Sequence, residues 1–293
     1  MDRLQRPGFR RLPRPGRIAL AGAVAGLVLV CTGCGGTSAA PTGPGTGTGT
    51  AASAGTPVPN LTPKVWTKPT PQATASGSTQ TGGTVFGKQP ITVSDASLVA
   101  QAKGTGIGVY TSATAGSPAL TLTNPLPSGA PLVFLVQERR PDRLRVLLPI
   151  RPNESQGWVR VSDVTLSQHD YRIAVSTGGH TLTLYKGGAV VMNVPVGLGT
   201  GATPTPGGVF YLKELLRPPN PNGAYGPYAY GLSGYSTVLE NFGGGDGELG
   251  IHGTDEPASI GKNVSHGCIR MSNDNITKLA NMLPLGVPVQ IIS

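Results

Sequence analysis

Apolar and polar residues alternate with a period of two from about residue 171 onwards. Ile173 and Val175 precede a Gly-Gly turn, and Leu182 and Leu184 resume the alternation after it. A period of two places the apolar side chains on one face of a strand, so the pattern predicts a hairpin. A second Gly-Gly pair at 187–188 leads into a third apolar segment, which predicts three consecutive antiparallel strands.

The same C-terminal region contains further strand patterns and one persuasive helix. Val209–Leu212 and Val287–Ile292 are short apolar runs bounded by turn residues, and each predicts a strand. Ser272 or Asn273 can cap a helix whose apolar face is Ile276, Leu279, Ala280 and Leu283. Residues 170–293 are therefore predicted to form a mainly β domain, a β-sandwich with one C-terminal helix.

Residues 91–169 show shorter strand patterns. Apolar runs at 106–110, 132–136 and 144–148 are each bounded by Pro, Gly, Ser or Asn, which indicates a small β-barrel. Gly157–Val161 resembles the closing strand of a bacterial Src-homology-three-like barrel. Packing is the expected role of Trp158 in that strand, and the barrel as a whole is either a wall-binding domain or a structural support.

Residues 34–90 have a different composition. They are rich in Gly, Thr, Ser, Ala and Pro, contain no Asp or Glu, and carry charge only at Lys64, Lys68 and Lys88. Such a segment cannot bury enough apolar surface to offset the entropy of ordering it. We expect a disordered tether with a root-mean-square span of roughly 40 Å.

The first 33 residues are typical of an export signal. Six arginines precede a continuous run of apolar and small residues, Ile18–Val30, which is too short to span a bilayer comfortably. Thr32-Gly33-Cys34 resembles the end of a bacterial lipobox, although Cys31 stands where Leu is usual. The prediction is a signal peptide over 1–33, lipidation of Cys34, and an exported protein anchored on the outer face of the cytoplasmic membrane. The alternative is a leader that carries no lipid.

Most of the basic charge belongs to this leader. The chain carries a net charge of +9, and the six arginines and one aspartate of the leader account for +5 of it. The remaining +4 does not indicate a nucleic-acid partner. We read it as an ordinary solvated surface.

Candidate chemistry centres on Cys268, the only cysteine outside the leader. His266 lies two residues before it and His252 sixteen residues before it, and an imidazole within reach activates a thiol as a nucleophile. Cys268 is therefore predicted to be the nucleophile of an acyl-transfer enzyme. A zinc site built from His252, Asp255, His266 and Cys268 is the weaker interpretation, because no His-Glu-x-x-His or Cys-x-x-Cys motif is present. A papain-like peptidase would place its cysteine before its histidine in the sequence. Here the order is reversed, which argues against that class.

Three segments together resemble a known family. Ile251-His252-Gly253-Thr254, Ser259-Ile260-Gly261 and Ser265-His266-Gly267-Cys268-Ile269-Arg270-Met271 are similar to the active-site signature of the YkuD-type L,D-transpeptidases, bacterial peptidoglycan cross-linking enzymes. The Thr205-Pro206-Gly207 turn and the Gly286–Val289 ending also match. Two departures are visible: Ser272 stands where many members carry His or Asn, and the Gly- and Tyr-rich segment 223–247, either a lid or a solvated loop, resembles nothing in the family pattern.

The resemblance implies a role for each matched residue. Cys268 would be the nucleophile and His252 the general base and acid, with His266, Gly267 and Gly253 assisting or forming an oxyanion hole. Arg270 and Ser265 would bind substrate, with Arg270 either holding a carboxylate or only bracing the site.

The implied reaction needs no cofactor or metal. It forms a thioester on a peptidoglycan stem tetrapeptide, releases D-alanine and passes the acyl group to an amine of a second stem. Carbapenem-type β-lactams are the implied inhibitors. The alternatives are an L,D-carboxypeptidase that uses the same site with water, or a non-catalytic wall-binding lipoprotein.

Overall fold

The computed structural model describes residues 56–57, 93–94, 96–242 and 245–292. The predicted signal peptide, Cys34 and nearly all of the predicted tether lie outside the described residues. Two residues of that tether, Thr56–Pro57, form β1 and pair with the strand β13. Within the described residues, no helix has the length and apolar character needed to cross a membrane.

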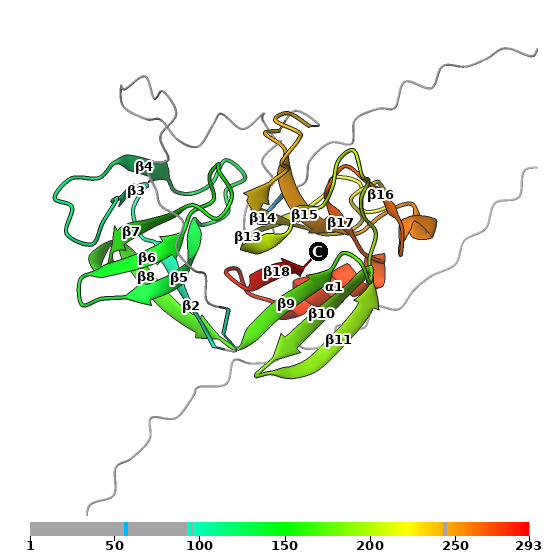
Figure 1. Cartoon of the computed structure of the whole chain (residues 1–293), viewed down its shortest axis with the longest axis horizontal. Helices are drawn as coiled ribbons and strands as arrows, with labels where there is room; N and C mark the ends of the chain where they lie inside the picture. Colours follow the sequence, from blue (N-terminus) through cyan, green and yellow to red (C-terminus); the bar gives the residue numbers. More distant parts are fainter. Residues whose placement is uncertain (1–55, 58–92, 95, 243–244, 293) are drawn as a thin grey trace, which may run out of the picture. The chain divides into compact units, whose positions relative to one another are not determined.

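The C-terminal region is one curled nine-stranded sheet (Figure 1). The order is β11-β10-β9-β18-β13-β14-β15-β17, with β1 beside β13. The strands are β9 (Tyr171–Ser176), β10 (Thr181–Lys186), β11 (Ala189–Pro195), β13 (Gly208–Arg217), β14 (Ala229–Tyr235), β15 (Glu248–His252), β17 (Ile269–Arg270) and β18 (Pro288–Ile292). A small parallel pair, β12 (Leu198–Gly199) and β16 (Asn263–Ser265), lies outside this sheet.

The predicted elements of this region are confirmed, with one difference of architecture. β9, β10 and β11 pair antiparallel through the two Gly-Gly turns, and Ile173, Val175, Leu182 and Leu184 are buried in the core as the alternation requires. The mainly β fold with one C-terminal helix is confirmed, and the strands expected to form a β-sandwich belong to one sheet that curls upon itself. The segment 223–247 is not one loop, because β14 runs through its middle with Tyr230 buried.

The helix α1 (Asn273–Met282) closes the core of this sheet. Ser272 caps it by accepting a hydrogen bond from the Asn275 N–H, and Ile276 and Leu279 are completely buried. Burying an aliphatic side chain of this size stabilises a fold by roughly 1.5–3 kcal/mol. The Tyr230 hydroxyl donates to the carbonyls of Leu279 and Leu283, which fixes the end of the helix against β14.

The N-terminal region is a second β structure. A five-stranded antiparallel sheet has the order β7-β6-β5-β2-β8, and a β3-β4 hairpin joins it through a bridge between Tyr110 and Trp158. Trp158 is buried, in agreement with its predicted packing role. The elements are β2 (Ser97–Ala102), β3 (Gly106–Val109), β4 (Leu120–Thr123), β5 (Val133–Arg139), β6 (Arg143–Leu147), β7 (Gln156–Arg160), the short helix η1 (Val161–Asp163) and β8 (Val164–His169).

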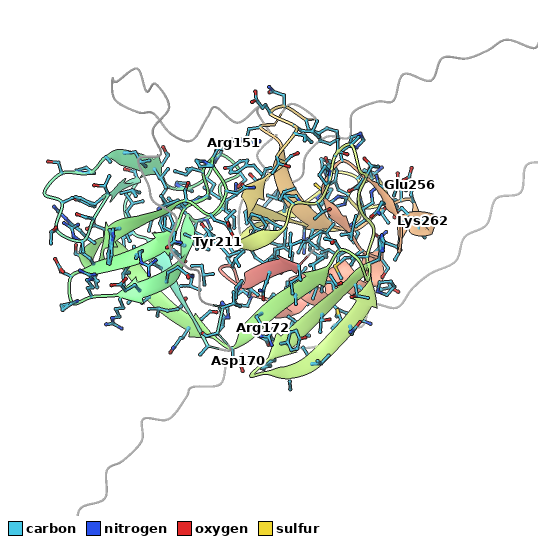
Figure 2. The ribbon with its side chains drawn as sticks, in the orientation of Figure 1. Arg151, Asp170, Arg172, Tyr211, Glu256 and Lys262 are labelled. Carbon is cyan, nitrogen blue, oxygen red and sulfur yellow. The ribbon has the colours of Figure 1, made fainter. Side chains whose placement is uncertain are left out.

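Side chains connect the two regions directly. The Tyr211 hydroxyl donates to the Val133 carbonyl at 2.9 Å, and Tyr211 packs in a cluster with apolar residues of β2, β5 and β6. Arg151 donates to the carbonyls of Ser236, Leu239 and Asp246 (Figure 2 labels Arg151 and Tyr211). The N-terminal region therefore holds both ends of the loop between β14 and β15.

Candidate active site

The loop between β16 and β17 is wrapped tightly around Cys268. The Ser265 hydroxyl donates to the Cys268 carbonyl at 2.6 Å and accepts from the Gly267 N–H at 3.1 Å. Gly267 has φ = +118°, a conformation that only glycine adopts readily. Because this residue reverses the backbone, Cys268 projects from a turn rather than from an extended strand.

Two threonines of the preceding turn hold this loop from the other side. Thr205 Oγ1 donates to the Gly267 carbonyl and accepts from the Gly199 N–H, each at 2.9 Å. Thr203 Oγ1 donates to the Ser265 carbonyl at 3.1 Å. The Thr-Pro-Gly turn singled out in the sequence thus has a structural explanation, since it fixes the backbone of the cysteine loop.

Strand register brings Cys268 and His252 to the same face. β15 and β17 run parallel with Ile251 opposite Ile269 and His252 opposite Arg270, so Cys268 lies opposite Gly250. The Cys268 Sγ is 3.9 Å from the position that a Cβ on Gly250 would occupy. Alternate residues of a strand share a face, so Gly250 and His252 present the same side of β15 to the thiol.

His252 is buried and oriented by its neighbour. It is 5% exposed, and its Nδ1–H donates to the Gly253 carbonyl at 2.6 Å. A carbonyl can only accept, so Nε2 is left unprotonated and free to take a proton. Burial lowers the pKa of His252 to about 4, partly offset by the Gly253 hydrogen bond. The Tyr225 ring packs against the imidazole with its centroid 4.8 Å away.

Cys268 is partly buried and protonated at rest. Burial raises the pKa of its thiol to about 11, while a hydrogen bond from the Gly250 backbone acts in the opposite direction. The nearby Glu248 carboxyl raises this pKa further and Arg270 lowers it. Cysteine and histidine therefore stand as a neutral thiol and a neutral imidazole near pH 7.

A buried group of charges lies beside this pair. Lys213 of β13 forms ion pairs with Glu248 and, at 3.4 Å, with Glu214, and Ser128 of the N-terminal region donates to Glu214. Burial acts against the Lys213 ammonium, but the two carboxyls hold its pKa well above the usual range. Burial raises the pKa of Glu248 to about 8, against the lowering influence of Lys213. One lysine therefore serves two carboxyls, and burial makes the ionised form of Glu248 less favourable than it is in water.

Arg270 reaches toward the site but already has a partner. Its Nη1 donates to Glu256 Oε2 at 2.5 Å, and its side chain is 17% exposed (Glu256 is labelled in Figure 2). Its Nε is buried and has no acceptor within the described residues. Both predicted roles, carboxylate binding and bracing, stay open.

The two remaining predicted side chains, Ser265 and His266, differ in burial. The buried Ser265 uses its hydroxyl to hold the cysteine loop, and its role in substrate binding stays a prediction. His266 is exposed, with its ring 4.7 Å from that of Phe242.

The oxyanion candidates also differ in availability. The Gly253 N–H donates to the Tyr228 carbonyl at 3.3 Å, and the Gly267 N–H is bound to Ser265. The Cys268 N–H has no acceptor in the described part of the chain, so it is the amide left to receive a developing oxyanion.

The sequence reasoning missed Lys213 and Glu248 as part of this site. A signal was present, since Lys213-Glu214 interrupts the apolar run of β13, but the 35-residue separation of Lys213 from Glu248 hides the pairing. Tyr225 was noted only as one of several tyrosines in its segment. For metals, the described residues contain no group of three or more His, Cys, Asp or Glu side chains that could hold an ion.

Comparison with known proteins concerns mainly the C-terminal region. Curated proteins named YkuD from Bacillus licheniformis and Bacillus subtilis, both described as L,D-transpeptidases, are 43% identical to it over 121 residues. Each match covers 41% of this chain and 65% of the relative, so the chain spans less than two thirds of the relatives it matches.

Solved structures resemble it more distantly. A mutant of the Enterococcus faecium L,D-transpeptidase is 24% identical with a TM-score of 0.33, covering 42% of this chain and 49% of that one. An L,D-transpeptidase in complex with imipenem is 19% identical with a TM-score of 0.37, covering 67% and 82%. Structural similarity at this level does not assign a function to this chain.

The family match is direct. Residues 170–291 match the YkuD family, described as an L,D-transpeptidase catalytic domain. The matched range contains both Cys268 and His252 and begins where β8 gives way to β9. The C-terminal region of this chain is therefore similar, over residues 170–291, to the L,D-transpeptidase catalytic domain of the YkuD family.

Proposed function

We propose that the protein is a cysteine-dependent L,D-transpeptidase that cross-links peptidoglycan stem peptides through a thioester on Cys268. The observation that carries the proposal is the shared face of β15, where the Cys268 thiol lies over Gly250 on the same side as the oriented imidazole of His252. A thiol and a base held in this way are the parts that acyl transfer requires.

The first half-reaction acylates the enzyme. Because the thiol has a pKa of about 11 and the imidazole about 4, a thiolate does not accumulate at rest. Proton transfer to His252 Nε2 therefore accompanies the attack of sulfur on the carbonyl of the L,D peptide bond. The Cys268 N–H receives the oxyanion. When the carbon–nitrogen bond breaks, His252 returns the proton to the departing D-alanine amine and the thioester remains.

The second half-reaction transfers the acyl group. An amine of a second stem attacks the thioester carbonyl and gives up a proton to His252. The carbon–sulfur bond then breaks, and the proton returns to the Cys268 sulfur. Water in place of the amine would release a free tripeptide stem, so the balance between cross-linking and carboxypeptidase activity depends on access of the acceptor.

Product analysis tests this proposal. Purified protein incubated with a disaccharide-tetrapeptide should release D-alanine and yield a cross-linked dimer, both detected by mass spectrometry. Cys268→Ala should abolish both products while its thermal unfolding stays unchanged, because the side chain is small and only partly buried. D-alanine release without dimer would favour the carboxypeptidase. Turnover by Cys268→Ala would contradict the assignment.

Inhibitor chemistry offers a second test of the same nucleophile. We expect carbapenems to acylate Cys268, because a reactive acyl donor forms a covalent bond with the nucleophile of an acyl-transferring site. Intact-mass measurement should show one adduct per chain, which peptide mapping assigns to Cys268. A protein with a free thiol and no adduct after prolonged exposure would argue against an acyl-transferring site.

We further propose that the enzyme acts outside the cytoplasm, held by a lipid on Cys34. The family acts on the cell wall, and the leader and the Thr32-Gly33-Cys34 sequence support export and anchoring. Cys34→Ser should leave the protein unprocessed or release it from the membrane fraction. Partition of the unaltered protein into the aqueous phase of a detergent extraction would exclude the anchor.

A further inference from the structure

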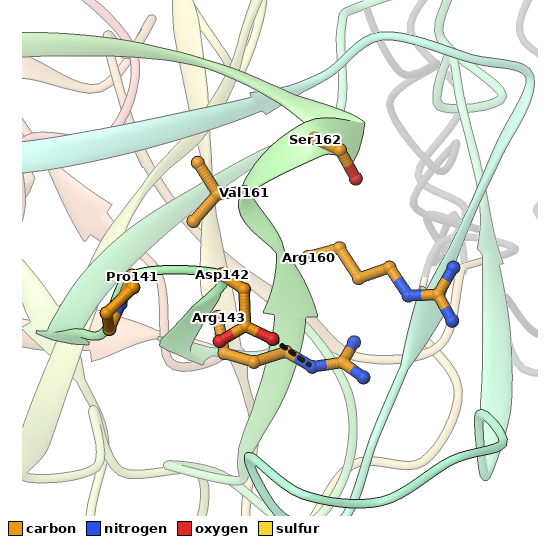
Figure 3. Close-up of a pocket in the computed structure, with 6 residues that line it drawn as sticks. All are labelled: Pro141, Asp142, Arg143, Arg160, Val161 and Ser162. Carbon is orange, nitrogen blue, oxygen red and sulfur yellow. Dashed lines mark ion pairs between the residues drawn. The ribbon is translucent and has the colours of Figure 1, made fainter.

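A cavity in the N-terminal region, distant in sequence from the cysteine loop, is lined by two arginines. Its volume is about 510 Å³ (Figure 3). Arg143 opens β6, Arg160 ends β7, and the first turn of η1 supplies the adjacent wall. The lining residues are Pro141, Asp142, Arg143, Arg160, Val161 and Ser162.

Arg143 is a buried cation with incomplete bonding. Its side chain is 9% exposed and lies over the Tyr110 ring, with Cζ 4.0 Å from the ring centroid. Nε and Nη2 donate to the carbonyls of Ala113 and Ala115 at 3.3 and 3.1 Å. Nη1 is buried without any acceptor in the described part of the chain.

Its nearest carboxylate does not compensate this charge. Asp142 lies 4.0 Å from the Arg143 Nε, at the limit of an ion pair, and its side chain is 81% exposed. Solvent weakens the attraction of so exposed a group. A buried guanidinium without a close counter-ion is unfavourable by several kcal/mol, so native structures pair such groups.

A second arginine faces the same aromatic ring. The Arg160 Cζ is 5.3 Å from the Tyr110 ring centroid, and no carboxylate among the described residues lies within 4.0 Å of its guanidinium. Figure 3 shows both guanidinium groups extended to the same side of the pocket. Two like charges around one ring repel each other unless an anion lies between or beside them.

We propose that this pocket binds an oxyanion, a carboxylate or phosphate group carried by a cell-wall polymer, with Arg160 as the principal donor and Arg143 as the buried counter-charge. Guanidinium groups match the planar geometry of both anions and bind them with charge-assisted hydrogen bonds. The cell wall as the source rests on the proposed function, whereas the oxyanion chemistry does not. The N-terminal region would then hold the enzyme on its substrate rather than merely support the catalytic sheet.

Titration of the full-length protein with inorganic phosphate and with acetate, at constant ionic strength, tests the chemistry. Arg160→Ala should weaken binding about tenfold, the usual effect of losing one charge-assisted hydrogen-bond donor. Asp142→Asn should strengthen binding by a few-fold, because it removes the one carboxylate in the pocket lining.

Arg140→Ala is the matched control. Arg140 belongs to the same region and stacks on an aromatic ring, Trp158, but it is paired with Glu138 and lies outside the pocket lining. It should leave phosphate and acetate binding unchanged. Equal effects of Arg140→Ala and Arg160→Ala, or no saturable binding of either anion, would overturn the proposal. Arg143→Lys keeps the buried positive charge, so it is the variant to use at this position if removal of the charge prevents folding.

The source of the anion is separated by binding to purified cell walls. Full-length Cys268→Ala should sediment with walls in an Arg160-dependent manner, so a failure here is distinct from a failure of the transpeptidase assay. Loss of that binding after removal of phosphate-containing polymers would identify phosphate, and loss after amidation of stem-peptide carboxyls would identify carboxylate. Arg160-dependent binding that survives both treatments would exclude wall anions.

Discussion

The N-terminal region (residues 96–169) and the candidate catalytic region (residues 170–292) are both β structures with buried apolar cores, but they differ in the charged residues that they bury. Among the described residues of the N-terminal region, Arg143 is the one buried charged residue, and it lines the pocket described above. In the catalytic region, Lys213, Glu214 and His252 are each 7% exposed or less.

The comparison shows where this chain gives up stability for chemistry. Burying ionisable groups shifts their pKa values, and folding alone does not require such shifts. In the candidate catalytic region the buried Lys213 is paired with Glu248, whose carboxyl acts on the Cys268 thiol, so the buried charge is linked to the candidate chemistry. Four substitutions or measurements would sharpen or break this contrast.

The largest effect is expected from His252. His252→Gln keeps the size and polarity of the side chain but removes the base, so the acylation rate should fall roughly 100- to 10,000-fold. Stopped-flow measurement of carbapenem acylation gives the rate directly. His180→Asn is the control, because the partly exposed His180 ring bonds the Asn263 side chain and its φ of +49° suits asparagine. A larger loss in His266→Ala than in His252→Gln would exchange the two roles.

The resting protonation of Cys268 should be visible in its alkylation. Since burial raises the pKa of the thiol to about 11, the thiolate fraction is small at pH 7. The rate of reaction with iodoacetamide should therefore increase about tenfold per pH unit from pH 7 to pH 10. A rate that is already high and constant between pH 5 and pH 8 would indicate a thiolate–imidazolium pair and contradict the neutral pair.

Breaking the buried charge group should destabilise the fold more than breaking a surface pair. Lys213→Met leaves two carboxyls facing each other without their cation, a loss of about 3–5 kcal/mol in the free energy of unfolding for a fully buried pair. The lower end is expected, because the Glu248 side chain is 25% exposed.

Urea denaturation of three variants makes this comparison between regions. Arg140→Met in the N-terminal region breaks the exposed pair with Glu138 and should cost about 0–1 kcal/mol. Lys213→Met combined with Glu248→Gln should recover part of the loss, because it removes one unpaired carboxyl. Equal destabilisation by Lys213→Met and Arg140→Met would show that the charge group is not effectively buried.

The smallest effect concerns the contact between the regions. The Tyr235 hydroxyl donates to the Pro149 carbonyl at 2.8 Å, so Tyr235→Phe should cost about 1 kcal/mol of stability. Tyr185→Phe, at a ring stacked on Arg172, is the control and should cost less. Turnover should be unchanged in both variants. A loss of turnover in Tyr235→Phe would mean that the N-terminal region influences the site through this contact.

Local patterns predicted much of this fold. The hairpin through Leu182, the helix capped by Ser272 and the last strand all follow from alternation, capping and turn residues within short windows. The motif around Cys268 likewise made the cysteine and His252 candidates, and the register of β15 and β17 then brings both to one face.

The remainder depends on contacts that no local window contains. Strand order places β18 between β9 and β13, and Lys213 meets Glu248 only because their strands flank β14. The role of Ser265 was also hidden, since its hydroxyl could have turned to solvent or to the loop. Only the positive φ of Gly267 brings the loop backbone back onto it.

The position of β18 has a consequence for how the enzyme matures. A chain synthesised from its N-terminus can pair β9 with β10 and β11, and β13 with β14 and β15, as two separate sheets. Only β18 joins them, parallel to β9 and antiparallel to β13. The curled sheet is complete only after β18 has been synthesised and has paired with β9 and β13. The two halves of the core therefore become one continuous sheet only when this late strand has paired on both sides.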